Sequence, residues 1–198
     1  MQNRKRAYET LYRTNLETGR IIIDIALNGY NEFFHEWDNS VFRKRDIHQE
    51  LANFLDLCSE EIPLRRKLEI QFYVKNAERS SETEGRIRAS YVNYYSALLR
   101  GELRKTKGIA KTSVILLMVA TALLFLHVIW SGAINNSIIA KVFLESLLIG
   151  GWVFTWEAIH GFSIDILAPF RRGREIKRFI RADITFSYTP QPNTQNAG

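Results

Sequence analysis

Two long apolar stretches dominate the second half of the chain. Residues 113–130 read SVILLMVATALLFLHVIW, and residues 138–159 read IIAKVFLESLLIGGWVFTWEAI. As helices, these segments would be roughly 27 and 33 Å long, enough to cross the hydrocarbon layer of a membrane. Core helices of soluble proteins rarely stay apolar on every face over such a length. We therefore expect two transmembrane helices, antiparallel because the uncharged link between them, residues 131–137, is short.

The first half of the chain has the pattern of a small α+β domain. Apolar and polar residues alternate over residues 20–27 (RIIIDIAL) and 67–74 (KLEIQFYV), which predicts two strands. Between them, residues 46–60 predict a helix with Asp46 as its N-cap. Its apolar face would hold Ile47, Leu51, Phe54, Leu55 and Cys58.

A long helix is expected to begin at Ser80 and to continue into the first transmembrane segment as one rod. Nothing before residue 113 clearly breaks its pattern. Its apolar stripe would consist of Ile87, Tyr91, Tyr94, Leu98 and Leu103.

After the second transmembrane segment, Pro169 is expected to end the helical pattern. A short basic helix, residues 171–180, and a strand, residues 184–188, would follow. The tail of residues 189–198 is made largely of Pro, Asn, Gln and Thr, which predicts disorder.

The net charge of +6 is concentrated beside the apolar segments. Residues 1–105 hold 18 Lys and Arg against 16 Asp and Glu, a surplus of only two. Two basic clusters flank the apolar hairpin: Arg100, Arg104, Lys105, Lys107 and Lys111 before it, and Arg171, Arg172, Arg174, Lys177, Arg178 and Arg181 after it. The positive-inside rule places both clusters, and so both chain ends, in the cytoplasm. There they would contact anionic lipid headgroups, which argues against a nucleic-acid partner.

Together these patterns predict an α+β protein, with a small cytoplasmic sheet-plus-helix domain fused to a two-helix transmembrane hairpin. The cytoplasmic domain would cover residues 1–112 and the hairpin residues 113–162. Residues 163–198 would form a cytoplasmic basic segment with the third strand and the tail.

The second apolar segment contains two charged residues, Lys141 and Glu145, which are spaced to share a helix face and to pair. An unpaired charge at this depth costs roughly 2.5–3.5 kcal/mol on insertion scales, so Glu145 is expected to face protein or water. One interpretation is a polar cluster within the hairpin, formed with Thr121 and His127. The other is that Glu145 lines an oligomeric interface or a water path.

Other residues of the hairpin suit a membrane. Gly150 and Gly151 lie in the middle of the second segment, where glycine is unfavourable unless it allows close helix packing. The side chains of Trp130, Trp152 and Trp156, with Arg171 and Arg172, are expected at the two membrane interfaces.

Candidate chemistry is sparse. The common nucleotide-binding, zinc-protease and hydrolase motifs do not occur in the sequence, and the single cysteine, Cys58, excludes an internal disulfide. The ligand types His35, Glu36, Asp38, Asp46 and His48 gather in one stretch, but their spacing fits no known metal site. We therefore expect no metal, no cofactor and no enzymatic activity.

A dense aromatic group lies next to these charges, formed by Phe33, Phe34, Trp37 and Phe42. It is interpreted either as core beneath a loop or as an exposed anchor for a protein partner or the membrane surface.

The run ESLLIGGWVFTW of residues 145–156 and the PFRR turn of residues 169–172 resemble a group of uncharacterised bacterial two-pass membrane proteins. The stretches IIIDIAL of residues 21–27 and IPLRRKLEI of residues 62–70 are similar to the same group. The resemblance implies a bacterial inner membrane, a cytoplasmic domain and a two-helix hairpin, but no reaction.

Two functions are therefore expected. The first is a homo-oligomeric membrane effector or channel-like assembly that is controlled by its cytoplasmic domain. The alternative is a membrane-anchored scaffold that recruits a cytoplasmic protein partner. An intramembrane enzyme ranks last because no nucleophile–base or metal constellation is visible.

Overall fold

The computed structural model describes residues 8–34, 47–75, 78–132 and 138–188. The chain divides into two compact units. Residues 1–99 and 174–198 belong to the first, called the sheet unit, and residues 100–173 to the second, called the hairpin unit.

The sheet unit contains a four-stranded mixed sheet with the strand order β1-β2-β3-β4. The strands are β1 (Arg13–Thr14), β2 (Ile21–Leu27), β3 (Leu68–Val74) and β4 (Asp183–Tyr188). β2, β3 and β4 are parallel, while β1 pairs antiparallel with β2. The predicted strands at residues 20–27, 67–74 and 184–188 are confirmed, and the two-residue β1 was not predicted.

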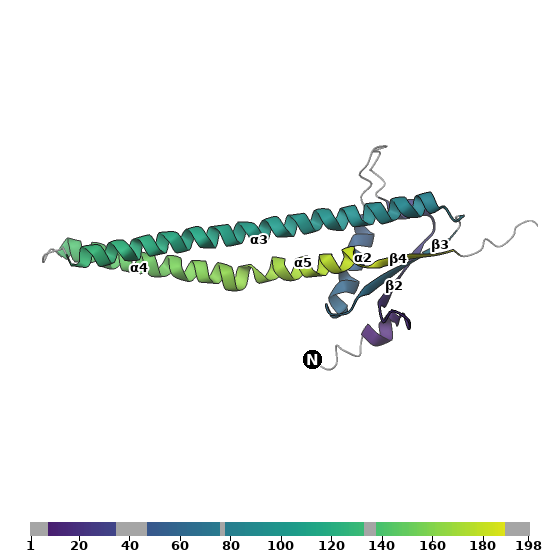
Figure 1. Cartoon of the computed structure of the whole chain (residues 1–198), viewed down its shortest axis with the longest axis horizontal. Coiled ribbons are helices and arrows are strands. Elements are labelled where there is room, and N and C mark those ends of the chain that lie inside the picture. Colours follow the sequence, from purple (N-terminus) through teal and green to yellow (C-terminus); the bar gives the residue numbers. More distant parts are fainter. Residues whose placement is uncertain (1–7, 35–46, 76–77, 133–137, 189–198) are drawn as a thin grey trace, which may run out of the picture. The chain divides into compact units, whose positions relative to one another are not determined.

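Both crossovers between the parallel strands contain helices. The first carries a 3₁₀ turn, η1 (Tyr30–Phe33), and helix α2 (Gln49–Glu61). The second contains α3 (Ser81–Ser131), α4 (Ile138–His160), a π-helical turn η2 (Gly161–Asp165) and α5 (Leu167–Ile180). The whole hairpin unit is thus inserted into a single connection, between β3 and β4 (Figure 1).

One face of the sheet is buried and the other is polar. Ile21, Ile23 and Ile25 of β2 are buried, whereas Asp24 and Ala26 between them are exposed. The buried face forms one core with side chains from three of the helices: Ala52, Leu55 and Cys58 of α2, Ile87, Tyr91 and Tyr95 of α3, and Ile176 and Phe179 of α5. The alternating pattern of the sequence is visible because the opposite face stays open.

The open face is cross-linked by polar side chains. Arg13 Nη2 lies 2.5 Å from Asp24 Oδ1 and donates to the Tyr73 hydroxyl at 2.6 Å. Asn15 donates to the Glu69 carboxylate at 2.8 Å, which satisfies a carboxylate that is largely buried. These bonds join three strands and their connections, and among the described residues no helix covers this face.

The predicted helix at residues 46–60 is confirmed, but its details differ. It begins at Gln49, and His48 caps it by accepting a bond from the Glu50 amide at 3.3 Å. The expected cap, Asp46, lies outside the described residues. Leu55 and Cys58 are buried as expected, whereas Phe54 is 45% exposed because the buried face is centred closer to Ala52.

The single rod predicted from Ser80 onward is confirmed as the 51-residue helix α3. Ser80 is its N-cap, since its hydroxyl accepts a bond from the Thr83 amide at 3.3 Å. Ile87 and Tyr91 of the predicted stripe are buried, and Tyr95 joins them, while Leu103 is exposed.

The prediction that Pro169 ends the helical pattern is wrong. Pro169 is the third residue of α5, in the first turn, where a missing amide hydrogen breaks no intrahelical bond. The α-helical pattern changes earlier, at the π turn η2, and the basic helix predicted for residues 171–180 begins at Leu167. The predicted disordered tail lies outside the described residues.

Candidate functional site

The two helices of the hairpin unit meet along a seam of mostly small residues spaced seven apart. Side chains at seven-residue intervals face the same side of a helix that packs in a left-handed pair. On α3 the seam residues are Ser113, Ala120 and His127, and on α4 they are Leu144, Gly151 and Ala158. All of them are buried except His127, which is half-buried. Small seam residues let the backbones approach closely, the usual basis of helix association in lipid.

Gly151 lies at the tightest part of this seam. A Cβ atom at Gly151 would lie 2.7 Å from Leu124 Cγ, too close for van der Waals contact, and 3.4 Å from the Ala120 carbonyl oxygen. A Cβ atom at Gly150 would meet only Leu123 Cδ1, at an ordinary 3.6 Å. The packing role predicted for both glycines is therefore supported for Gly151 alone.

A second close approach, at Gly161, was not predicted. An added Cβ atom there would collide with the Ser113 hydroxyl. Because Gly161 is the first residue of the π turn η2, the change of helical pattern occurs where the second helix contacts the first. The glycine itself is the only feature of the sequence that indicates this close approach.

Away from the seam, most side chains on the outer surface of the two apolar segments are exposed and apolar. In α3, only 11% of the most apolar stretch of 18 residues is buried. In the helical run Ile138–Ile180, only 6% of the corresponding stretch is buried. By length and composition, both are able to cross a membrane. The tryptophans predicted for the interfaces, Trp130, Trp152 and Trp156, are exposed on this surface.

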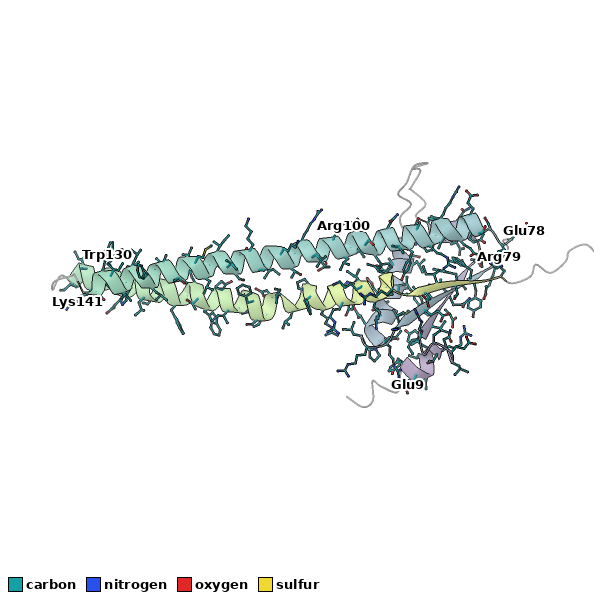
Figure 2. All side chains as sticks on the ribbon, viewed as in Figure 1. Glu9, Glu78, Arg79, Arg100, Trp130 and Lys141 are labelled. Carbon is teal, nitrogen blue, oxygen red and sulfur yellow. The ribbon has the colours of Figure 1, made fainter. Side chains whose placement is uncertain are left out.

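The link end of the hairpin carries the indole of Trp130, which lies 5.7 Å from the Phe143 ring (Figure 2). At the other end of the unit, Arg171 is exposed and Arg172 is half-buried. These positions agree with an apolar span bounded by residues that favour an interface.

The polar cluster expected within the hairpin does not form. The half-buried His127 bonds through Nδ1 to the Leu144 carbonyl oxygen at 2.9 Å, so this nitrogen carries the hydrogen. The Thr121 hydroxyl donates to the Leu117 carbonyl of its own helix at 2.8 Å. Lys141 and Glu145 are both exposed and form no ion pair with each other.

Glu145 instead lies on the outer surface of α4. Its helical neighbours on this face are Lys141, Ile149 and Trp152, at spacings of four, four and seven residues. Ile149 and Trp152 are 63% and 69% exposed. Apart from Lys141, this carboxylate therefore projects from an apolar surface, about two helical turns from the start of α4.

In the sheet unit, a chain of hydrogen bonds closes the carboxyl edge of the parallel strands. The Tyr188 hydroxyl at the end of β4 donates to Glu84 Oε1 at 2.5 Å and lies 2.8 Å from the Tyr30 hydroxyl. Tyr30 in turn accepts a bond from the Ser80 amide at 3.2 Å. Burial, with these bonds, raises the pKa of the Tyr188 hydroxyl. Ligands often bind at this edge of open α/β sheets. At the end of β4 these side chains bond to one another instead and tie the start of α3 to β4.

The aromatic group predicted as core or as a partner surface is placed in the core as far as the structure describes it. Phe33 and Phe34 are 0% and 7% exposed, and the Phe33 ring packs 5.7 Å from that of Phe72. They cannot form an exposed anchor. Trp37 and Phe42 lie outside the described residues.

The residues considered as metal ligands give no site in the described ranges. His48 caps α2, and the other four, His35, Glu36, Asp38 and Asp46, lie outside those ranges. Within residues 8–34, 47–75, 78–132 and 138–188, no three His, Cys, Asp or Glu side chains gather in a group that could hold a metal ion. Cys58 is buried, and burial raises the pKa of its thiol, which makes the reactive thiolate scarce.

No protein-family model matches this chain, and comparison with curated proteins and with solved structures finds no match either. The resemblance to bacterial two-pass membrane proteins therefore stays a prediction. The function has to be argued from the geometry of the two units.

Proposed function

We propose that this chain is a two-pass protein of the bacterial inner membrane, and that it assembles into a homo-oligomeric, channel-like effector under the control of its sheet unit. The observation that carries the proposal is the exposure of Glu145 on an otherwise apolar surface of the hairpin unit. In water such a residue needs no explanation. In a membrane it needs a partner.

The free energy of inserting α4 into a membrane also indicates that Glu145 needs a partner. Each Leu, Ile, Phe or Val near the centre of a transmembrane helix contributes roughly −0.3 to −0.6 kcal/mol on the insertion scale. The segments 113–130 and 138–159 each hold eleven such residues, so each gains roughly 3–7 kcal/mol. The first carries no charge, whereas each of Lys141 and Glu145 would cost the second up to roughly 3 kcal/mol. An isolated second helix is therefore only marginally stable in lipid.

Lys141 can reduce this cost by extending its amine toward the nearby membrane surface. Glu145 is one turn deeper and has a shorter side chain, so its carboxylate needs protein or water. The hairpin seam cannot supply them, because Glu145 projects away from it. A second copy of the chain, packed against the outer face of α4, provides both a cover and a route for water.

A single hairpin cannot enclose a pore, since it supplies only two helices. Four or more protomers would supply at least eight, with Glu145 of every protomer directed at an interface or a lumen. Rings of acidic side chains are a common lining of cation-conducting pores.

The sheet unit is connected to the hairpin by continuous helices. α3 and α5 each belong to both units, and the start of α3 is held by the bonds among Ser80, Tyr30, Tyr188 and Glu84. A change in the sheet unit can therefore act on the hairpin without passing through a flexible loop. The burial of Phe33 and Phe34 removes part of the support for the scaffold alternative.

Mass measurement of the full chain in lipid nanodiscs is the first test, with four or more protomers expected. Ion flux into liposomes is then compared between the natural chain, Glu145→Gln and Glu157→Gln. The last variant is a matched control, because Glu157 is an exposed carboxylate on the same helix, close to its end. Flux that is lost in Glu145→Gln and kept in Glu157→Gln supports the proposal.

A monomer or dimer, or flux that is unchanged in Glu145→Gln, contradicts the channel-like assembly. Either result would favour the scaffold alternative and a search for a cytoplasmic partner.

A further inference from the structure

A strongly basic pocket is present in the sheet unit. Its volume is about 480 Å³, within the range of small-molecule sites. Three segments of the chain line it: the residue before β2, the connection from α2 into β3, and the last turns of α5. Eight of the ten lining residues are basic, namely Arg20, Arg65, Arg66, Lys67, Arg174, Lys177, Arg178 and Arg181, and the other two are Leu64 and Leu68.

Two of these eight cations have a structural role. The Arg178 side chain is buried and donates to the carbonyl oxygens of Ser59, Ile62 and Pro63 at 2.9, 3.0 and 3.0 Å. It therefore satisfies the free carbonyls at the end of α2. Arg20 pairs with Asp183 at 2.8 Å. These residues build the walls of the pocket and bring its three segments together.

The other six cations are exposed and, among the residues that the structure describes, form no ion pair: Arg65, Arg66, Lys67, Arg174, Lys177 and Arg181. A sphere of 480 Å³ is about 10 Å across, close to the Debye length at physiological ionic strength. Salt therefore does not fully screen these charges from one another, and their mutual repulsion opposes the folding of this region.

Helix dipoles do not account for this surplus of charge. The carboxyl ends of α2 and α5 each provide about half a negative charge, so together they balance about one of the cations. Asp183 balances one more, through Arg20. Of the eight positive charges about six remain, and no acidic side chain lines the pocket.

We propose that this pocket binds a multiply charged, phosphate-bearing anion. Guanidinium groups bind phosphate oxygens through two parallel hydrogen bonds, and lysine adds a mobile point charge, so six such groups match several phosphate charges better than one carboxylate. Leu64 and Leu68 leave room for an apolar part of the ligand. The phosphates could belong to a soluble molecule or to the headgroup of an anionic lipid. This inference does not depend on the oligomeric assembly proposed above.

The test uses the full chain in nanodiscs of neutral phosphatidylcholine, with tripolyphosphate as the soluble probe at physiological ionic strength. The variant is Arg65→Gln/Arg66→Gln, which removes two exposed guanidinium groups and leaves Arg178 and Arg20 in place. The matched control is Arg100→Gln/Arg104→Gln, which removes the same charge from two exposed arginines outside the pocket. Circular dichroism verifies that both variants are folded.

Calorimetry is expected to show saturable binding of tripolyphosphate to the natural chain and to the control. In the pocket variant the Kd is expected to rise at least about 30-fold, since each charge-assisted contact is worth roughly tenfold or more. Binding that weakens equally in both variants would reflect general electrostatics and would overturn the proposal.

A second arm examines the lipid source. The natural chain and both variants are purified from membranes containing phosphatidylglycerol and phosphatidic acid, and retained lipids are counted by native mass spectrometry. Anionic lipid that is retained by the natural chain and the control, but lost from the pocket variant, identifies a headgroup as the ligand. If the pocket variant neither loses tripolyphosphate binding nor loses lipid, the pocket is not an anion site.

Discussion

The neighbouring glycines of α4 provide a sharp test of the hairpin packing. Replacing Gly150 by alanine adds a methyl group in ordinary contact with Leu123, at 3.6 Å. Because alanine is favoured over glycine in helices by about 1 kcal/mol, this variant is expected to be slightly more stable than the natural chain. The same replacement at Gly151 gives the same gain in helix propensity, but its methyl group would lie 2.7 and 2.8 Å from Leu124 Cγ and Cδ2.

The steric cost at Gly151 exceeds the gain. Overpacking of this kind costs about 1–3 kcal/mol, since Leu124 has to leave its rotamer or the helices have to separate. The difference in unfolding free energy between the two alanine variants is therefore expected to be about 2 kcal/mol, or about 30-fold in the unfolding equilibrium. Gly150→Ala is a matched control, because it has the same chemistry one residue away.

Unfolding of the two variants can be compared by titrating sodium dodecyl sulfate into mild-detergent micelles and following helicity by circular dichroism. We expect a lower midpoint for Gly151→Ala than for Gly150→Ala. A second change, Leu124→Ala, is expected to restore much of the loss because it removes the atoms in conflict, with a coupling energy of about 1 kcal/mol or more. Equal midpoints for the two glycine variants would show that the helices do not meet at Gly151.

Three further predictions concern the sheet unit and the topology. Because Cys58 is buried and its pKa is raised, its reaction with a thiol reagent is expected to be at least about tenfold slower in the native chain than in urea; equal rates would place it at the surface. Arg178→Lys is expected to lower the unfolding free energy by about 2–4 kcal/mol in urea titrations, because lysine cannot reach all three carbonyl oxygens. Arg181→Lys, at an exposed position, is expected to leave the unfolding free energy nearly unchanged. In intact spheroplasts, a membrane-impermeant maleimide is expected to label Gly132→Cys but not Glu17→Cys, and the reverse pattern would invert the topology.

The parallel strands and the long helix could be predicted from the sequence for a physical reason. Ile21, Ile23 and Ile25 alternate with less buried residues because only one face of the sheet is covered by helices. Had both faces been covered, the strands would read as continuous apolar runs and would be harder to separate from buried helix. α3 was predictable because no proline occurs between Ser80 and its end.

Other features have no local signal. β1 is two residues long and is defined only by its partner Ile21–Ile22. The π turn η2 begins where Gly161 closely approaches Ser113, a residue 48 positions away in the sequence. Pro169 was misinterpreted because proline is compatible with the first turn of a helix, and nothing in the sequence located that first turn.

The candidate sites show the same limit. Glu145 could be identified from the sequence as a charge in an apolar segment, but its direction depends on which face of α4 meets α3. Its expected neighbours Thr121 and His127 were chosen by depth alone. At the seam, His127 bonds to the Leu144 carbonyl oxygen. Glu145 directly follows Leu144 and therefore lies about 100° around the helix from that contact.

The basic pocket changes how the charge of the chain is understood. From the sequence, the run from Arg171 to Arg181 is a topology signal, yet four of its members line the pocket together with residues more than 100 positions away. The topology argument survives without them. Five basic residues lie between Arg100 and Lys111, immediately before the first apolar segment, and none lies in the link of residues 131–137. That imbalance alone satisfies the positive-inside rule. The rule therefore does not explain why Arg65, Arg66 and Lys67 line one pocket together with the basic residues at the end of α5. A bound anion would explain it.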